Sequence, residues 1–183
     1  MSVKNKICRL KIVLISSFFL VGCGSAQIED HANQKPSLHL EKFFEGKLAA
    51  HGVVKDFRGS VVRHFNADIH ASWKDGVGTL VEDFVFDDGE LQRRIWTLTP
   101  DGSGGYIGTA GDVVGQGVIR IAGNAMFLKY VLRIPFRHDT LDITVDDRMY
   151  LVNPSTLINE SRLIKFGFEV GEILLVISKK SSS

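Results

Sequence analysis

Acidic side chains crowd one short stretch of the chain, where paired carboxylates can perform acid–base catalysis or bind calcium. The set consists of Asp83, Asp87, Asp88 and Glu90. The stretch also contains Asp88-Gly89, a typical hairpin turn, and it lacks the spacing of an EF-hand loop. Three interpretations stay open: a turn with a solvated acidic face, ion pairs with the nearby arginines, or a functional site.

Two arginines follow this stretch, and a guanidinium is suited to recognising carboxylates and phosphates. Neighbours in a strand face opposite ways, so Arg94 shares a face with Trp96, whereas Arg93 shares its face with apolar residues. We therefore expect Arg93 to point inward, where an unpaired charge is very costly. Asp147, on the apolar parity of its own strand, is the predicted partner. The pair is either structural or the polar end of a cavity that holds a ligand carboxylate or phosphate.

Aromatic and charged side chains of this kind suit a site for an amphipathic small molecule. The candidate ligand-binding residues are Arg93, Trp96, Tyr130, Asp147 and Tyr150. His64 and His70 are about 20 Å apart at the rise of a strand, too far for one metal ion. Hydrolase, zinc-protease and phosphate-loop motifs are absent from the sequence, so no catalytic residue, metal or cofactor is predicted.

Strands must position these residues, because polar and apolar side chains alternate along most of the chain. Turn dipeptides such as Asp75-Gly76 and Gly123-Asn124 separate the alternating runs. The predicted strands are 47–55, 60–74, 77–87, 90–99, 104–111, 113–121, 125–136, 139–152, 155–166 and 169–179. Nothing between them has a helical pattern, which excludes parallel βαβ units.

A meander of this length protects its edges best by closing on itself. We predict an all-β fold, a single antiparallel up-and-down barrel of about nine or ten strands over residues 37–180, with one short helix at 38–44. A two-sheet sandwich is the alternative. The residues expected to point inward are Phe65, Ile69, Trp73, Leu128, Tyr130, Leu132, Ile143 and Val145.

The N-terminus has the parts of an export signal: basic residues, the apolar run 12–21, and small residues before Cys23. Leu20-Val21-Gly22-Cys23 has the form of a bacterial lipobox. We predict a signal peptide over residues 1–22, lipidation of Cys23 and a flexible tether to residue 36. The alternatives are an ordinary secreted protein and an uncleaved anchor. Gly24 predicts the periplasmic face of the outer membrane, by similarity to enterobacterial lipoproteins.

Charge and cysteine content support this interpretation. The chain has 183 residues, and once the four basic residues before position 22 are set aside, 18 basic residues face 21 acidic ones. A mildly acidic protein is a poor partner for nucleic acid. Cys8 would leave with the signal peptide, so Cys23 would be the one cysteine left and no intramolecular disulfide could form.

Four segments resemble a known family. They are FDDGELQRRIW at 86–96, TAGDVVG at 109–115, DDRMYL at 146–151 and KFGFEVGE at 165–172. In this order they are similar to the proteobacterial domain-of-unknown-function family 3833, over about residues 38–178. The resemblance implies a lipoprotein with a lipocalin-like fold and brings no known activity or catalytic residue.

The sequence leaves three classes of function open. The first is a lipid-anchored envelope protein that binds or carries a lipid or fatty-acid-like molecule inside the barrel. The second is a non-enzymatic interaction protein with a filled barrel and another envelope protein as its partner. The third is an enzyme that uses the acidic stretch and the arginines. A cavity of several hundred Å³ would favour the first over the second.

Overall fold

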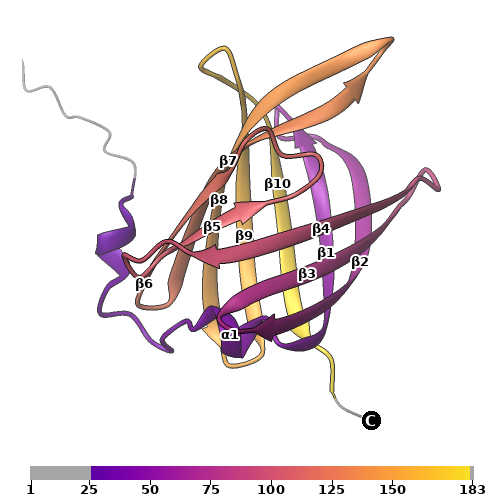
Figure 1. The fold of residues 1–183 in the computed structure, drawn as a ribbon. Coiled ribbons are helices and arrows are strands. Elements are labelled where there is room, and N and C mark those ends of the chain that lie inside the picture. Colours follow the sequence, from indigo (N-terminus) through magenta and orange to yellow (C-terminus); the bar gives the residue numbers. More distant parts are fainter. Residues whose placement is uncertain (1–25, 182–183) are drawn as a thin grey trace, which may run out of the picture.

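The alternating sequence forms ten antiparallel strands that close into one barrel (Figure 1). The structure is a computed structural model and describes residues 26–181. The strands are β1 (Gly46–Asp56), β2 (Val61–Lys74), β3 (Val77–Phe86), β4 (Leu91–Pro100), β5 (Tyr106–Thr109), β6 (Gly117–Ala122), β7 (Ala125–Phe136), β8 (Asp139–Asn153), β9 (Thr156–Lys165) and β10 (Phe168–Lys179). The predicted all-β barrel is confirmed, and each predicted strand overlaps an observed one.

Each strand pairs with the next, and β1 closes the barrel by pairing with β10. The closing register runs from Leu48 opposite Lys179 to Asp56 opposite Gly171, so neither terminal strand is left as an open edge. Short turns make this order possible. Gly76 and Gly89 sit in two of them with φ of 77° and 84°, values that L-residues with side chains rarely adopt.

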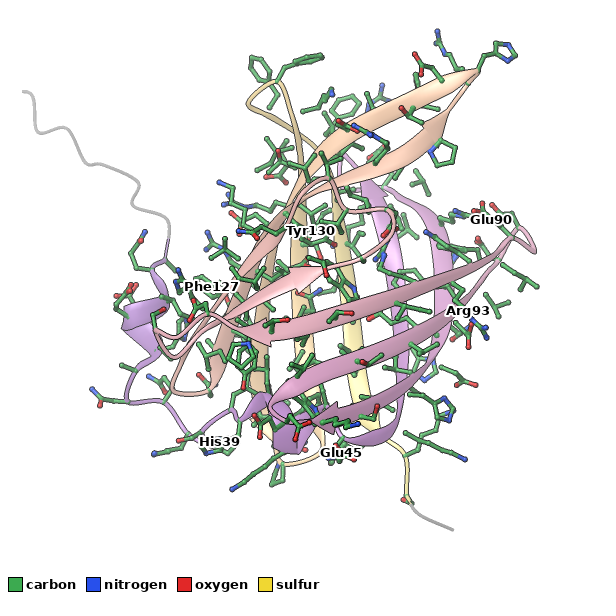
Figure 2. All side chains as sticks on the ribbon, in the orientation of Figure 1. His39, Glu45, Glu90, Arg93, Phe127 and Tyr130 are labelled. Carbon is green, nitrogen blue, oxygen red and sulfur yellow. The ribbon has the colours of Figure 1, made fainter. Side chains whose placement is uncertain are left out.

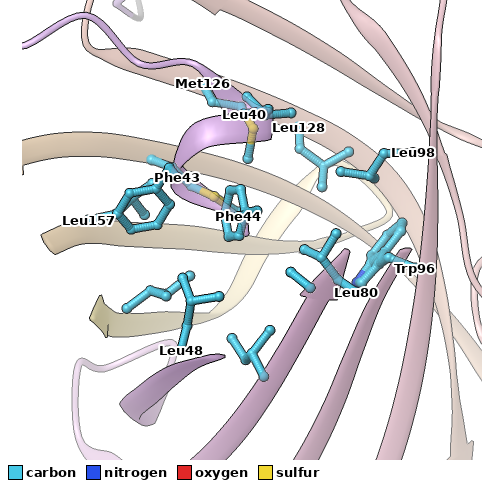
Figure 3. Packing of buried hydrophobic residues seen from close by; sticks show 14 of the residues in the cluster. Leu40, Phe43, Phe44, Leu48, Leu80, Trp96, Leu98, Met126, Leu128 and Leu157 are labelled. Carbon is cyan, nitrogen blue, oxygen red and sulfur yellow. The ribbon is translucent and has the colours of Figure 1, made fainter. Parts of the chain in front are cut away.

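The core lies at one end of the barrel, beneath the short helix α1 (Leu40–Phe43). Phe43 and Phe44 pack with Leu48 and Leu157, both of which are fully buried (Figure 3). The Trp73 indole N–H donates a hydrogen bond of 2.6 Å to the carbonyl of Phe44. The helix is shorter than the predicted 38–44, and it closes this end of the barrel (Figure 1).

The sequence overestimates the length of β5 and β6. Between them, residues 110–116 fold back onto β7 instead of continuing the strands. The Val114 N–H donates to the Val131 carbonyl at 2.8 Å, and the Arg133 N–H donates to the Asp112 carbonyl at 2.8 Å. This β5–β6 loop therefore brings Asp112 to the barrel wall.

The N-terminal segment follows the outside of the barrel. The 3₁₀ helix η1 (Ile28–His31) contacts β6 and β7, with the His31 ring 5.2 Å from the ring of Tyr150. A side chain at Gly123 would collide with the His31 carbonyl, and the Gly123 carbonyl accepts a hydrogen bond of 2.7 Å from Leu38. Residues 28–31 of the tether predicted over 23–36 therefore pack against the barrel wall, and residues 23–25 lie outside the described residues.

The predicted signal peptide and Cys23 lie outside the described residues. Within residues 26–181, no helix has the length and apolar character needed to cross a bilayer.

Candidate functional site

The barrel encloses a cavity of about 280 Å³. Its wall is mostly apolar and aromatic, with side chains from strands all around the barrel. The apolar lining consists of Ala50, Val54, Phe65, Ile69, Phe84, Phe86, Trp96, Leu128, Tyr130, Leu132, Ile134, Ile143, Met149, Leu163, Ile173, Leu175 and Ile177. One end is closed by α1, and no helix of the described residues covers the other end, which we call the mouth (Figure 1).

Polar side chains interrupt this wall from two sides. On one side Glu82 of β3 lies opposite Arg94 of β4 in the strand register. On the other side Asp147 of β8 lies opposite Ser161 of β9, with Asn159 on the same inner face. The rings of Trp96 and Tyr130 pack edge to face, with their centroids 5.2 Å apart. Tyr130 is labelled in Figure 2. The cavity therefore has a polar belt within an apolar wall.

Both arginines that line the cavity are already paired with carboxylates. Arg94 forms an ion pair of 2.8 Å with Asp112 of the β5–β6 loop. Burial opposes its charge, but Tyr130, Asp112 and Glu82 outweigh that effect and raise the pKa of Arg94. The Arg94 guanidinium therefore stays charged and held by Asp112.

Arg63 lies toward the mouth and stacks on the Phe86 ring at 3.6 Å. One of its terminal nitrogens is 2.7 Å from a carboxylate oxygen of Asp88 and 2.7 Å from one of Glu90. These contacts raise the pKa of Arg63, led by the hydrogen bond to Asp88. Its charge is therefore compensated by the acidic turn outside the cavity.

The two carboxylates of the belt have no such partner. Neither Glu82 nor Asp147 forms an ion pair within residues 26–181. Burial raises the pKa of Glu82 to about 7, and the Arg94 charge only partly opposes this. Burial likewise raises the pKa of Asp147 to about 6, against hydrogen bonds from Ser161 and Asn159. Ionising either carboxyl therefore costs free energy, and near neutral pH Glu82 is only partly ionised.

Two more polar atoms of the belt lack partners within the described part of the chain. Asn159 is buried, and its Nδ2 donates to Ser161 Oγ at 3.1 Å, but its Oδ1 accepts no hydrogen bond. The hydroxyl of Tyr130 forms no hydrogen bond, and burial raises its pKa well above 10, so it stays neutral. Polar groups inside proteins are rarely left in this state, which makes them candidates for ligand contacts.

Three of the five sequence-predicted ligand-binding residues line the cavity: Trp96, Tyr130 and Asp147. Arg93 does not. It lies on the outer surface, with 66% of its side chain exposed, and pairs with Asp83 at 2.5 Å (Figure 2). The predicted internal pair of Arg93 with Asp147 is wrong. The reason is that β4 turns Gln92 and Arg94 toward the cavity, on the same face as Trp96, and turns the apolar Leu91, 74% exposed, toward solvent together with Arg93.

Tyr150 also lies outside the cavity. It follows Met149, which points inward, so its own ring faces outward against Phe127 and His31. Its hydroxyl is 3.5 Å from a carboxylate oxygen of Glu160. The ring helps to hold η1 on the barrel wall rather than lining the cavity.

The acidic turn forms ion pairs. Asp87 is 2.9 Å from the His64 ring, and Asp83 pairs with Arg93, while the other two carboxylates hold Arg63. No group of potential metal ligands occurs within residues 26–181. Of the three interpretations, the ion-pair network is the observed one. Arg93 takes part as expected, but the second arginine of the network is Arg63, whereas Arg94 pairs with Asp112.

Sequence reasoning missed Glu82 and Asn159 as cavity residues. A signal was present, because each interrupts an apolar parity, Glu82 alone and Asn159 together with Ser161. Glu82 stands between Leu80 and Phe84, and Asn159 follows Leu157. The same signal identified Asp147. No sequence signal places Asp112 beside Arg94, because that contact depends on the fold of the β5–β6 loop.

The mouth carries exposed aromatic side chains at its hairpin tips. Phe57 follows β1, Phe136 ends β7, and Phe166 lies between β9 and β10. Each has a basic neighbour near its ring: Arg58 at 5.1 Å, Arg137 at 5.2 Å and Lys165 at 4.8 Å. Rings and cations of this kind are typical of surfaces that enter the headgroup region of a membrane.

Comparisons with known proteins identify the fold and no activity. A family model described as "Protein of unknown function (DUF3833)" matches residues 17–179. The structure of the S-type phycobiliprotein lyase CPES from Guillardia theta is similar, with a TM-score of 0.50 and 11% identity, covering 86% of this chain and 100% of that one. EF1p2_mFAP2b bound to DFHBI gives a TM-score of 0.43 and 6% identity, over 78% of this chain and 100% of that one. No curated protein matches.

Proposed function

The chain belongs to the DUF3833 family of proteins of unknown function, and we propose that its barrel binds one small amphipathic ligand with a lipid-like tail. The observation that carries the proposal is the cavity, an apolar and aromatic chamber with a polar belt. Such a combination holds the tail by burial and orients the head by hydrogen bonds.

The volume limits the ligand. A water molecule occupies about 30 Å³ of liquid, so the cavity of about 280 Å³ has room for roughly ten non-hydrogen atoms. That is enough for a small ring system or for the head and first part of a single alkyl chain, whose end would reach into the mouth, and too little for a phospholipid with two chains. The presence of this cavity also argues against the second class of function, an interaction protein whose barrel is filled with side chains. The proposal assigns no catalytic step to the cavity.

We further propose that the protein is anchored to the periplasmic face of the outer membrane through lipidated Cys23. Ala26 lies beside Lys129 and Arg148 on the outer wall formed by β7 and β8. Cys23 is three residues away, a reach of about 10 Å. An acyl anchor there would hold this flank of the barrel close to the bilayer. The aromatic tips at the mouth would then meet the headgroup region, and a lipid-like ligand could pass directly into the cavity.

Tryptophan fluorescence tests the proposal at a defined place. The chain has two tryptophans: Trp96 lines the cavity, and Trp73 lies at the closed end beneath α1. The full chain carrying Cys23→Ser, which cannot be acylated, provides the background for two single-tryptophan proteins, Trp73→Phe and Trp96→Phe. A brominated single-chain alcohol quenches an indole only at close range.

We expect saturable quenching of the chain that keeps Trp96 and little quenching of the chain that keeps Trp73. Quenching of both to the same extent would indicate binding on the surface. Absence of quenching at Trp96, with the far-ultraviolet spectrum unchanged, would refute binding inside the barrel.

A further inference from the structure

We propose that the cavity selects a ligand whose polar head donates hydrogen bonds and carries a positive charge, an alkyl ammonium group in its simplest form. This inference rests on the proposed function and adds the chemistry of the head. It differs from the fatty-acid-like ligand that the sequence suggested, because that expectation depended on a free arginine in the cavity.

Both arginines of the cavity are already paired with carboxylates, and the buried Nε of Arg63, near the mouth, has no acceptor within residues 26–181. Arg94 uses its Nε and a terminal nitrogen on Asp112, with Nε 2.9 Å and 3.1 Å from the two carboxylate oxygens. Arg63 is held by the two carboxylates of the acidic turn. A ligand carboxylate placed in the belt would have to displace the Arg94–Asp112 pair and would leave Asp112 without its partner.

The acidic groups of the belt, in contrast, lack a cation. Glu82 lies on β3 and Asp147 on β8, and both act electrostatically on the hydroxyl of Tyr130 that lies in the belt. Asp147 is only 5% exposed. An ionised carboxylate so enclosed is stabilised strongly by a cation that enters beside it. An ammonium head therefore gains from both carboxylates, whereas a third carboxylate is repelled by them.

Hydrogen bonding points the same way. The belt is rich in acceptors. The amide oxygen of Asn159 has no donor, and the carboxylates receive hydrogen bonds from neutral side chains alone, Trp96 for Glu82 and Ser161 with Asn159 for Asp147. An ammonium group has three donors and no acceptor, and a carboxylate has acceptors only. The unpaired Asn159 Oδ1 is an independent observation, since it depends on hydrogen-bond geometry and not on charge. A donor-bearing head satisfies it, and a carboxylate head leaves it unpaired.

Three probes with the same chain test the inference: dodecylamine, dodecanol and dodecanoate. Each probe is added at pH 7.5, below its micellar concentration, to the chain that keeps only Trp96 with the brominated alcohol bound. Recovery of the Trp96 fluorescence measures how tightly the probe competes. We expect dodecylamine to bind at least about tenfold more tightly than dodecanol, the effect of one added charge contact in a poorly solvated site. Dodecanoate should bind more weakly than dodecanol.

Two neighbouring carboxylates provide a matched pair of variants. Asp147→Asn removes the cavity charge, and Asp146→Asn removes a carboxylate that faces outward to Arg148 and Arg162. We expect Asp147→Asn to weaken dodecylamine binding about tenfold and to weaken dodecanol binding much less, because the alcohol loses no charge contact. Asp146→Asn should change neither. Glu82→Gln, on the opposite side of the belt, should repeat the effect of Asp147→Asn.

The results separate this inference from the proposed function. If dodecanoate binds as tightly as dodecylamine, the head assignment is wrong while ligand binding stands. If dodecylamine binds more tightly but neither Asp147→Asn nor Glu82→Gln weakens it, the preference arises elsewhere and the assignment to the belt is wrong. If none of the three probes displaces the brominated alcohol, or the alcohol itself does not bind, both proposals fail.

Discussion

Replacing Asp147 with Asn should make the ligand-free protein more stable at neutral pH. The carboxyl is 5% exposed, has no cation within ion-pair distance among the described residues, and has its pKa raised by burial from 3.8 to about 6. The folded state therefore holds this proton more tightly than the unfolded state does. The contribution of the group to stability is complete below pH 4 and is lost as the pH rises through 6.

The size of the effect follows from the two pKa values. One pKa unit corresponds to 1.36 kcal/mol, so the rise from 3.8 to about 6 costs the wild type about 3 kcal/mol once the carboxyl is ionised. Asn has nearly the same shape, cannot ionise and can still accept the Ser161 hydrogen bond. The variant should therefore match the wild type near pH 4 and exceed it by up to about 3 kcal/mol at pH 7.5.

Urea unfolding of the Cys23→Ser chain with and without Asp147→Asn, at pH 4.5, 6 and 7.5, measures this difference. The protein is first freed of bound amphiphile, because a ligand would stabilise the wild type. Asp146→Asn serves as the control and should lose stability at every pH, since it gives up its contacts with Arg148 and Arg162. A variant at Asp147 that is less stable than the wild type at pH 7.5, or a difference that does not grow with pH, would contradict the reasoning.

Three further predictions concern the wall, the mouth and the anchor. Arg94→Met should lower the free energy of unfolding by about 2–3 kcal/mol because it leaves Asp112 without a cation, and Arg93→Met should change it little; equal effects in urea unfolding would contradict their placement. Serine at both Phe136 and Phe166 should reduce co-sedimentation with anionic vesicles several-fold at unchanged stability, and unchanged vesicle binding would show that these tips do not enter the membrane. Cys23→Ser should abolish palmitate incorporation and leave soluble or unprocessed protein; labelling that persists, or unchanged fractionation with the outer membrane, would exclude this anchor.

The barrel itself could be predicted because local sequence patterns determine its strands and turns. Alternation gave the strands, and turn dipeptides such as Asp75-Gly76 separated them. Phe65 and Val145 point inward as expected, since each belongs to a run in which every second residue is apolar. Closure followed from the length of the meander, because an open sheet of ten strands would leave two long edges.

The site could be predicted only in part, since a cavity wall that is mostly apolar also admits polar side chains, as an exception to the rule that apolar residues point inward. On β4, Gln92 and Arg94 face the cavity while Leu91 faces solvent, so the rule chose Arg93. Asp147 was found because it is one polar residue in an apolar run. The contact of Asp112 with Arg94 had no local signal, because it depends on a loop that folds back onto β7.

The central claim is that the barrel holds a small amphiphile, and native mass spectrometry tests it most directly. The Cys23→Ser chain is purified without detergent from a lysate that contains membranes, next to a variant in which Ala50→Phe fills the cavity. We predict a fraction of the chain with one added small molecule, extractable as a single-chain amine, and no such fraction in the filled variant. A wild-type chain that shows only its own mass, with the barrel intact by circular dichroism, would contradict the account.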